Sequence, residues 1–184
     1  MRTEHGAMNG SGLPGGSDDP LSGFLDAKGF ANFLLDWAEV ERIDVTPMKL
    51  QKLMFFCAAE CASIFDVRLL RQDFEAWDYG PVIPSLYQEF KSEDRNPIKK
   101  RAMQFNPKTL RREIIRSEPP AVLLDVIRAT FDIYAPMSAE RLSDISHVYS
   151  GPWHVARDLF ARGMNMDRRI SYTLVRKQHQ RILQ

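Results

Sequence analysis

Side chains able to do acid–base chemistry are few in this sequence, and none stands in a recognisable catalytic pattern. Glu60 borders a predicted apolar helix face, where partial burial would raise the pKa of its carboxyl toward the range useful for proton transfer. His147 and His154 could act as general bases, but no nucleophile elbow or other triad context accompanies them. Structural roles are therefore favoured for all three, and an enzyme acting through Glu60 and His147 is kept as an alternative.

Metal and cofactor chemistry also lacks a candidate centre. Cys57 and Cys61 lie four apart on one predicted helix, whose rigid backbone rarely permits a disulfide, and the four histidines add no ligands at metal-binding spacing. There is no Gly-x-x-x-x-Gly-Lys loop, no Gly-x-Gly-x-x-Gly after a strand and no His-Glu-x-x-His. We expect two buried, unbridged cysteines, no metal, no cofactor and no catalytic residue.

Aromatic residues beside Gly-Pro dipeptides are better candidates for function. Trp77 and Tyr79 precede Gly80-Pro81, and Trp153 follows Gly151-Pro152. Aromatics at such turns are often core anchors, yet Trp and Tyr also supply much of the binding energy of protein interfaces. These residues are therefore candidates for contact with a partner protein.

A basic segment runs from Arg95 to Arg116, with eight Lys or Arg residues against Glu113 alone and with two interrupting prolines. We predict a basic connector that is a solvated loop, a surface for an acidic protein, or a track for nucleic-acid phosphates. No recognition helix with helix-turn-helix spacing stands out, so a DNA-binding autoregulator that uses this segment and the tail from Arg168 to Arg181 is not favoured.

Composition places the chain among globular proteins. The 184 residues are 44% hydrophobic and 27% charged, enough for one ordinary domain with a proper core. Residues 1–94 include 8 basic and 16 acidic residues, whereas residues 95–184 include 17 basic and 8 acidic residues. These opposite net charges can hold the two halves together or present acidic and basic surfaces to partners. Because no run approaches a membrane span and no apolar leader is visible, we expect a cytoplasmic protein without membrane contact.

Two helices are predicted in the first third of the chain. Apolar residues at three- and four-residue steps predict a helix over 28–40. A second helix is predicted over 46–65, because Thr46 is a good N-cap and Pro47 a good first residue. Its apolar stripe comprises Leu50, Leu53, Met54, Cys57, Cys61, Ile64 and Phe65. Phe55 and Phe56 point away from the stripe, so this helix should be a central post between neighbours.

The remaining pattern predicts a mainly α, compact multi-helix fold with a small β element near residues 74–78. The strand should be followed by a tight turn at Gly80-Pro81 and by a helix from Pro84 through Phe90. Further helices are expected over 121–134, over 138–146 with Ser138 as cap, after Gly151-Pro152, and over 170–183 with Ile170, Leu174 and Val175 inward.

Three segments together resemble a known family: Thr46-Pro47-Met48-Lys49-Leu50-Gln51-Lys52-Leu53-Met54-Phe55-Phe56, then Phe74-Glu75-Ala76-Trp77-Asp78-Tyr79-Gly80-Pro81-Val82-Ile83-Pro84-Ser85-Leu86-Tyr87, then Leu142-Ser143 with His147 and Gly151-Pro152-Trp153. Their order and spacing are similar to the Panacea, or SocA-like, antitoxin domain, also found in phage-associated GepA proteins. The resemblance covers about residues 30–160. The Cys57-Ala58-Ala59 continuation departs from the family's usual pattern.

The resemblance implies a mostly helical bacterial or phage antitoxin that neutralises a cognate protein toxin by direct binding. Some family members resemble adaptors that hand the toxin to an ATP-dependent protease, which is a second interpretation. The expected organisation is a disordered Gly-rich arm at 1–23, the antitoxin domain at 24–160 and a basic helix or tail at 161–184. Predicted signature or partner-binding residues are Lys49, Gln51, Lys52, Trp77, Tyr79, Gly80, Pro81, His147, Pro152 and Trp153.

Overall fold

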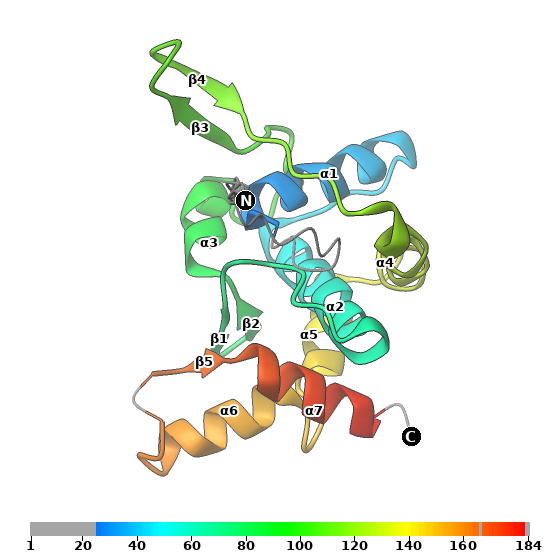
Figure 1. Cartoon of the computed structure of the whole chain (residues 1–184), viewed down its shortest axis with the longest axis vertical. Coiled ribbons are helices and arrows are strands. Elements are labelled where there is room, and N and C mark those ends of the chain that lie inside the picture. The colour runs from blue at the N-terminus through cyan, green and yellow to red at the C-terminus, as the bar shows by residue number, and fades with distance from the viewer. Residues whose placement is uncertain (1–24, 166, 183–184) are drawn as a thin grey trace, which may run out of the picture.

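Helices make up most of the computed structural model, which describes residues 25–165 and 167–182 (Figure 1). The mainly α prediction is therefore confirmed. The helices are α1 (Ala27–Val40), α2 (Pro47–Phe65), α3 (Pro84–Phe90), α4 (Ala121–Tyr134), α5 (Ala139–Ser146), α6 (Pro152–Ala161) and α7 (Tyr172–Ile182), with a short 3-10 helix at Lys91–Glu93. The predicted arm at 1–23 lies outside the described residues.

The start of α2 follows from local chemistry. Thr46 has an extended backbone, its side chain accepts from the Lys49 amide, and Pro47 stands at the first helical position. Every residue from Lys49 to Cys57 is buried, because α3, α4, α5, α7 and a β-strand all pack around the helix. The prediction of a central post is thus confirmed, including burial of Phe55 and Phe56 on the side away from the apolar stripe.

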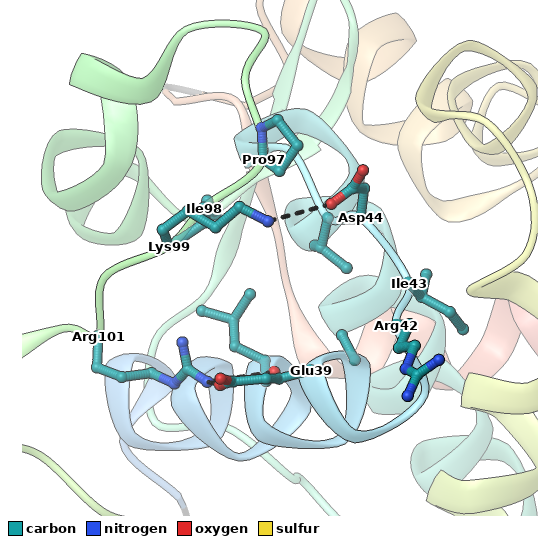
Figure 2. Close-up of a pocket in the computed structure, with 11 residues that line it drawn as sticks. Glu39, Arg42, Ile43, Asp44, Pro97, Ile98, Lys99 and Arg101 are labelled. Atoms are coloured by element: carbon teal, nitrogen blue, oxygen red, sulfur yellow. Dashed lines mark hydrogen bonds and ion pairs between the residues drawn. The ribbon is translucent and has the colours of Figure 1, made fainter.

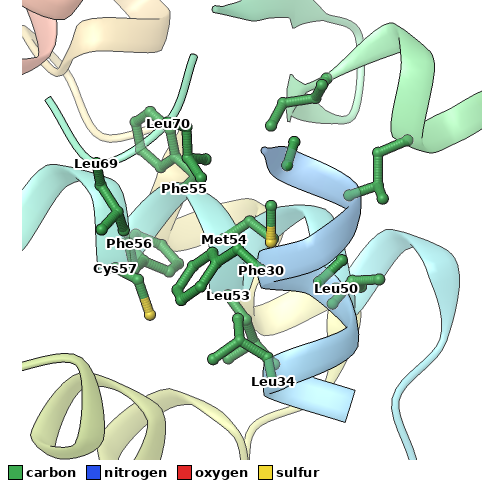
Figure 3. Packing of buried hydrophobic residues seen from close by; sticks show 14 of the residues in the cluster. Phe30, Leu34, Leu50, Leu53, Met54, Phe55, Phe56, Cys57, Leu69 and Leu70 are labelled. Carbon is green, nitrogen blue, oxygen red and sulfur yellow. The ribbon is translucent and has the colours of Figure 1, made fainter. Parts of the chain in front are cut away.

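The core is one cluster of apolar side chains centred on α2. Figure 3 shows Phe30 and Leu34 of α1 in the same cluster as Leu53 and Met54 of α2. Aromatic contacts extend it, as where the ring of Phe56 stacks on that of Tyr134 in α4 at 4.3 Å. Cys57 and Cys61 are buried free thiols within this cluster, as predicted.

Two small antiparallel sheets complete the fold. The strands are β1 (Phe74–Trp77), β2 (Gly80–Val82), β3 (Met103–Asn106), β4 (Arg111–Ile114) and β5 (Arg169–Ile170). The first sheet has the order β2-β1-β5, so Pro81 lies on an edge strand, where a missing N–H is tolerated. The second sheet is the β3–β4 hairpin, which projects from one end of the molecule beyond α1, whereas α6 and α7 lie at the opposite end (Figure 1).

Three details of the predicted elements were wrong. The connector at 95–116 contains the β3–β4 hairpin, whose strands are largely exposed and, at four residues each, too short for the sequence pattern to indicate them. Ile170 is buried as expected, but in β5, because it pairs with Phe74 before α7 begins. Ile64 is exposed, because it lies in the last turn of α2, where the chain leaves the helix through Asp66 in a left-handed conformation.

No described helix is long and apolar enough to cross a membrane.

Candidate functional site

The turn between β1 and β2 packs against Lys52 in the first half of α2. Trp77 pairs with Gly80 across the hairpin, and Gly80 adopts φ +103°, a conformation that side chains rarely allow. A Cβ at Gly80 would lie 2.6 Å from both Lys52 Cε and Ser146 Oγ. The glycine is therefore needed for its backbone conformation and for the close approach of the turn to α2 and α5.

Lys52 is buried beneath this turn, with 1% of its surface exposed. Its ammonium nitrogen donates to the carbonyl oxygen of Pro81 at 3.2 Å, and within the described part of the chain no carboxylate forms an ion pair with it. Because burial disfavours the charged amine, the pKa of Lys52 falls to about 7. Burial therefore favours the neutral form of this amine inside the fold.

Gln51 and Lys49 also bind backbone groups. The Gln51 amide oxygen accepts from the Ile83 N–H at 2.8 Å, and its amide nitrogen donates to the Ile83 carbonyl at 3.3 Å. Lys49 Nζ donates to the carbonyl of Asp44 at 3.1 Å, and burial lowers the pKa of this lysine. Gln51 therefore holds Ile83 just after β2, Lys52 holds Pro81 in β2, and Lys49 holds the loop before α2.

Two side chains of the α5–α6 region hold the other side of the turn. Ser143 Oγ donates to the Tyr79 carbonyl at 3.0 Å, and Trp153 Nε1 donates to the Trp77 carbonyl at 2.8 Å. Pro152 is buried at the first position of α6, immediately before Trp153. The three signature segments therefore meet in space. The hydrogen bond between Ser143 and Tyr79 joins residues that are 64 positions apart in the chain, and the one between Trp153 and Trp77 joins residues that are 76 positions apart.

His147 lies against this junction. Its ring stacks on Trp153 at 3.8 Å, and its Nε2 is buried without a hydrogen-bond partner among the described residues. Burial lowers the pKa of His147, and the neighbouring charge of Lys52 lowers it further. Both groups are consequently held toward their neutral forms.

The alternative of an acid–base pair formed by Glu60 and His147 gains no support. The charges that shift the pKa of His147 belong to Lys52, Asp144 and Arg157. The charge of Glu60 instead acts on Tyr134, whose pKa is raised first by burial and then by this carboxylate. The charge of Glu60 therefore does not contribute to the pKa shift of His147.

The exposed part of the site consists of aromatic side chains on its turns. Tyr79 is 74% exposed on the β1–β2 turn, and Tyr149 is 80% exposed between α5 and α6, where its ring contacts His154 at 4.9 Å. Arg157 forms an ion pair with Asp78, the residue before Tyr79, at 2.5 Å and covers the Trp153 ring. Exposed aromatic side chains on a fixed backbone can bind another protein. For a metal ion, the described residues contain no suitable cluster of three or more His, Cys, Asp or Glu side chains.

Comparison with known proteins agrees with this geometry. The family model described as "Antitoxin SocA-like, Panacea domain" matches residues 50–154, which run from the first turn of α2 into α6.

The chain belongs to this family.

It is also 31% identical over 143 residues to Antitoxin SocA of Caulobacter vibrioides (strain NA1000 / CB15N), covering 78% of this chain and 75% of the relative. No solved structure matches the chain.

The Panacea match includes nearly all the predicted signature residues, and the fold places most of them inside. Lys49 lies just before the matched range. Among these signature residues only Tyr79 is exposed, and three are half-buried: Trp77, His147 and Trp153. The others are buried: Lys49, Gln51, Lys52, Gly80, Pro81 and Pro152. The family signature is therefore mainly a supporting frame. Exposed Tyr149 was missed, although its place two residues before Gly151-Pro152 marked it as a turn aromatic.

An open pocket of about 320 Å³ lies elsewhere, between α1, the 42–45 loop and residues 97–101 (Figure 2). Most charged groups in its lining pair with each other: Lys99 with Asp44 at 3.3 Å, and Arg101 with Glu39 at 2.5 Å. None of the signature residues lines it. Its arrangement offers no acid–base pair or phosphate cradle.

Proposed function

We propose that this chain is the antitoxin of a toxin–antitoxin pair and neutralises its cognate protein toxin by direct binding. The observation that carries the proposal is the pair of exposed tyrosines, Tyr79 and Tyr149, of which Tyr79 lies on a turn held by hydrogen bonds from Ser143, Trp153 and Lys52. Membership of an antitoxin family and similarity to Antitoxin SocA support the same partner class. Antitoxins of this family are generally non-catalytic, which agrees with action by binding.

The frame beneath Tyr79 matters because binding must overcome the entropy of ordering the interface. The backbone carbonyls of Trp77, Tyr79 and Pro81 already accept bonds from Trp153, Ser143 and Lys52. A turn ordered before binding loses little conformational freedom on contact, so more of the gross interaction energy appears as affinity. Tyrosine adds large contact area with few rotatable bonds.

The test is co-expression with the product of the adjoining gene, followed by measurement of growth and of co-purification. The wild-type chain should restore growth and co-purify with that product. Tyr79→Ser combined with Tyr149→Ser should weaken the complex by at least about tenfold, because aromatic anchors typically contribute that much. Val40→Ser with Met164→Ser, which changes two other exposed apolar residues, is the matched control and should leave binding unchanged. Failure of the wild-type chain to bind would refute the proposal.

Delivery of the toxin to an ATP-dependent protease is the second route to neutralisation. It differs from occlusion in one measurable quantity, the half-life of the toxin in cells. Under direct occlusion this half-life is unchanged or longer when the chain is present; a shorter half-life would identify the adaptor route.

A further inference from the structure

The root of the β3–β4 hairpin is held to α1 by one buried side chain. Asn32 Oδ1 accepts from the Ala102 N–H at 2.7 Å, and its Nδ2 donates to the carbonyls of Ala102 and Ile115 at 2.9 and 2.8 Å. Arg101 adds ion pairs to Asp36 and Glu39 of α1. The hairpin therefore leaves the body from a fixed base, although it lies beyond the layer of helices (Figure 1).

One face of this hairpin is apolar and uncovered. Directly paired residues share a face, so Met103, Ile114, Phe105 and Arg112 lie together. Phe105 is 60% exposed, and Leu110 in the turn is 75% exposed. The opposite face is polar: Asn106 donates to Glu113 at 2.8 Å, and Arg111 lies on the same side. A two-stranded hairpin gains little stability alone in water, so the apolar face has surface to bury on contact.

The hairpin also carries unbalanced positive charge, with Arg112 on the apolar face, Arg111 on the opposite face and Lys108 in the turn. Lys108, Arg111 and Arg112 form no ion pair with the described residues, and the one carboxylate in the hairpin, Glu113, is occupied by Asn106 and Thr109. Those two bonds lower the pKa of Glu113 and keep it ionised. By contrast, Arg101 and Arg116 at the root are paired with α1. The free positive charge thus belongs to the outer half of the hairpin.

We propose that the β3–β4 hairpin is a docking arm that binds an apolar patch edged with carboxylates on the cognate toxin. This proposal rests on the proposed function and names a second contact surface for the same partner. Positive charge without partners attracts an acidic surface and raises the association rate. A protein is favoured over nucleic acid because phosphates would complement Arg111 and Arg112 but leave Phe105 and Leu110 in water.

The experiment measures binding of the purified full-length chain to the protein product of the adjoining gene at several salt concentrations. Arg111→Glu with Arg112→Glu should raise Kd at least about tenfold and reduce the salt dependence of the association rate. Phe105→Ser should raise Kd by a similar factor through faster dissociation, with the salt dependence retained. Circular dichroism and melting temperature verify that both variants keep the fold.

Matched controls carry the same changes elsewhere. Arg141→Glu with Lys177→Glu alters charge equally at exposed sites on α5 and α7, and Ile133→Ser removes an α4 side chain of similar exposure, 58%. Both should bind like the wild type. If hairpin and control variants are equally affected, or if folded hairpin variants bind normally, the docking arm is refuted while the antitoxin function stands.

Two further outcomes separate the alternatives. If the wild-type chain does not bind the product of the adjoining gene, the proposed function fails and the docking arm fails with it. A 30-base-pair duplex from the upstream promoter region is the nucleic-acid probe. Salt-sensitive binding of this duplex that is lost in Arg111→Glu with Arg112→Glu, together with unchanged toxin binding, would overturn the proposal in favour of DNA recognition.

Discussion

Lys52 donates its hydrogen bond to the carbonyl of Pro81 from a position almost completely shielded from water. A buried amine bound to a neutral carbonyl is unusual, because removing an ammonium from water is costly unless an opposite charge compensates. Here the compensation is loss of the proton, as the pKa near 7 indicates. The junction of α2, the β1–β2 turn and α5 is consequently sensitive to pH.

The first prediction is a pH-dependent free energy of unfolding that originates at Lys52. The folded pKa is about 7 and the unfolded value is 10.5, so between these values the unfolded chain binds the extra proton. Stability should therefore rise with pH above 7, with a slope of up to about 1.4 kcal/mol per pH unit from this one group. Urea denaturation at pH 7.0–8.5 measures it. Lys52→Met should lose this slope and Lys49→Met should keep most of it; equal slopes in Lys52→Met and wild type would contradict the assignment.

The second prediction concerns His147, whose pKa is lowered first by burial and then by the charge of Lys52. Removing that charge in Lys52→Met should raise the pKa of His147 toward 6.5. Because the folded pKa is depressed, stability from this group is present above about pH 6.5 and is lost as pH falls toward the folded value. NMR titration of the imidazole protons reads the pKa directly, and an unchanged titration in the variant would show that the two groups are not coupled.

The third prediction compares two glycines with positive φ. Gly80→Ala should reduce the free energy of unfolding by about 3 kcal/mol, because left-handed strain adds to overpacking against Lys52 and Ser146. Gly163→Ala is the control: its φ is +66° but nothing lies within 4 Å of an added Cβ, so only the strain of about 1 kcal/mol applies. Chemical denaturation of both variants checks the difference, and equal losses would mean that the close approach at Gly80 is unimportant.

The fourth prediction concerns the root of the hairpin. Asn32→Ala removes three hydrogen bonds and leaves the backbone groups of Ala102 and Ile115 without their partner, so the free energy of unfolding should fall by about 3 kcal/mol. Amide hydrogen exchange in β3 and β4 should accelerate more than exchange in α2. Uniform acceleration over the whole chain would show that Asn32 supports the core in general and not the hairpin in particular.

Local chemistry explains which parts of the site were predictable. The Thr46 cap, Pro47 and the spacing of apolar residues define α2 within the chain segment itself, and Gly80-Pro81 marks its turn in the same way. The family resemblance, carried by the order of three short segments, is confirmed by the match over 50–154. The boundaries of the domain at 24–160 and of the tail at 161–184 stay predictions.

Taken alone, the sequence determined the helical class, the central helix and the family, because these depend on short-range spacing and on residue identity. Tertiary structure decided that Lys52 and Gln51 are buried supports, since their partners Pro81 and Ile83 lie 29 and 32 residues away. It also decided the β3–β4 hairpin, because strands of four residues are too short for their pattern to predict pairing, and Asn32 reaches the root of the hairpin across 70 residues. Hydrogen bonds over such separations exist only once the chain has folded, and they distinguish the buried signature residues that hold the frame from the exposed side chains of Tyr79 and Tyr149.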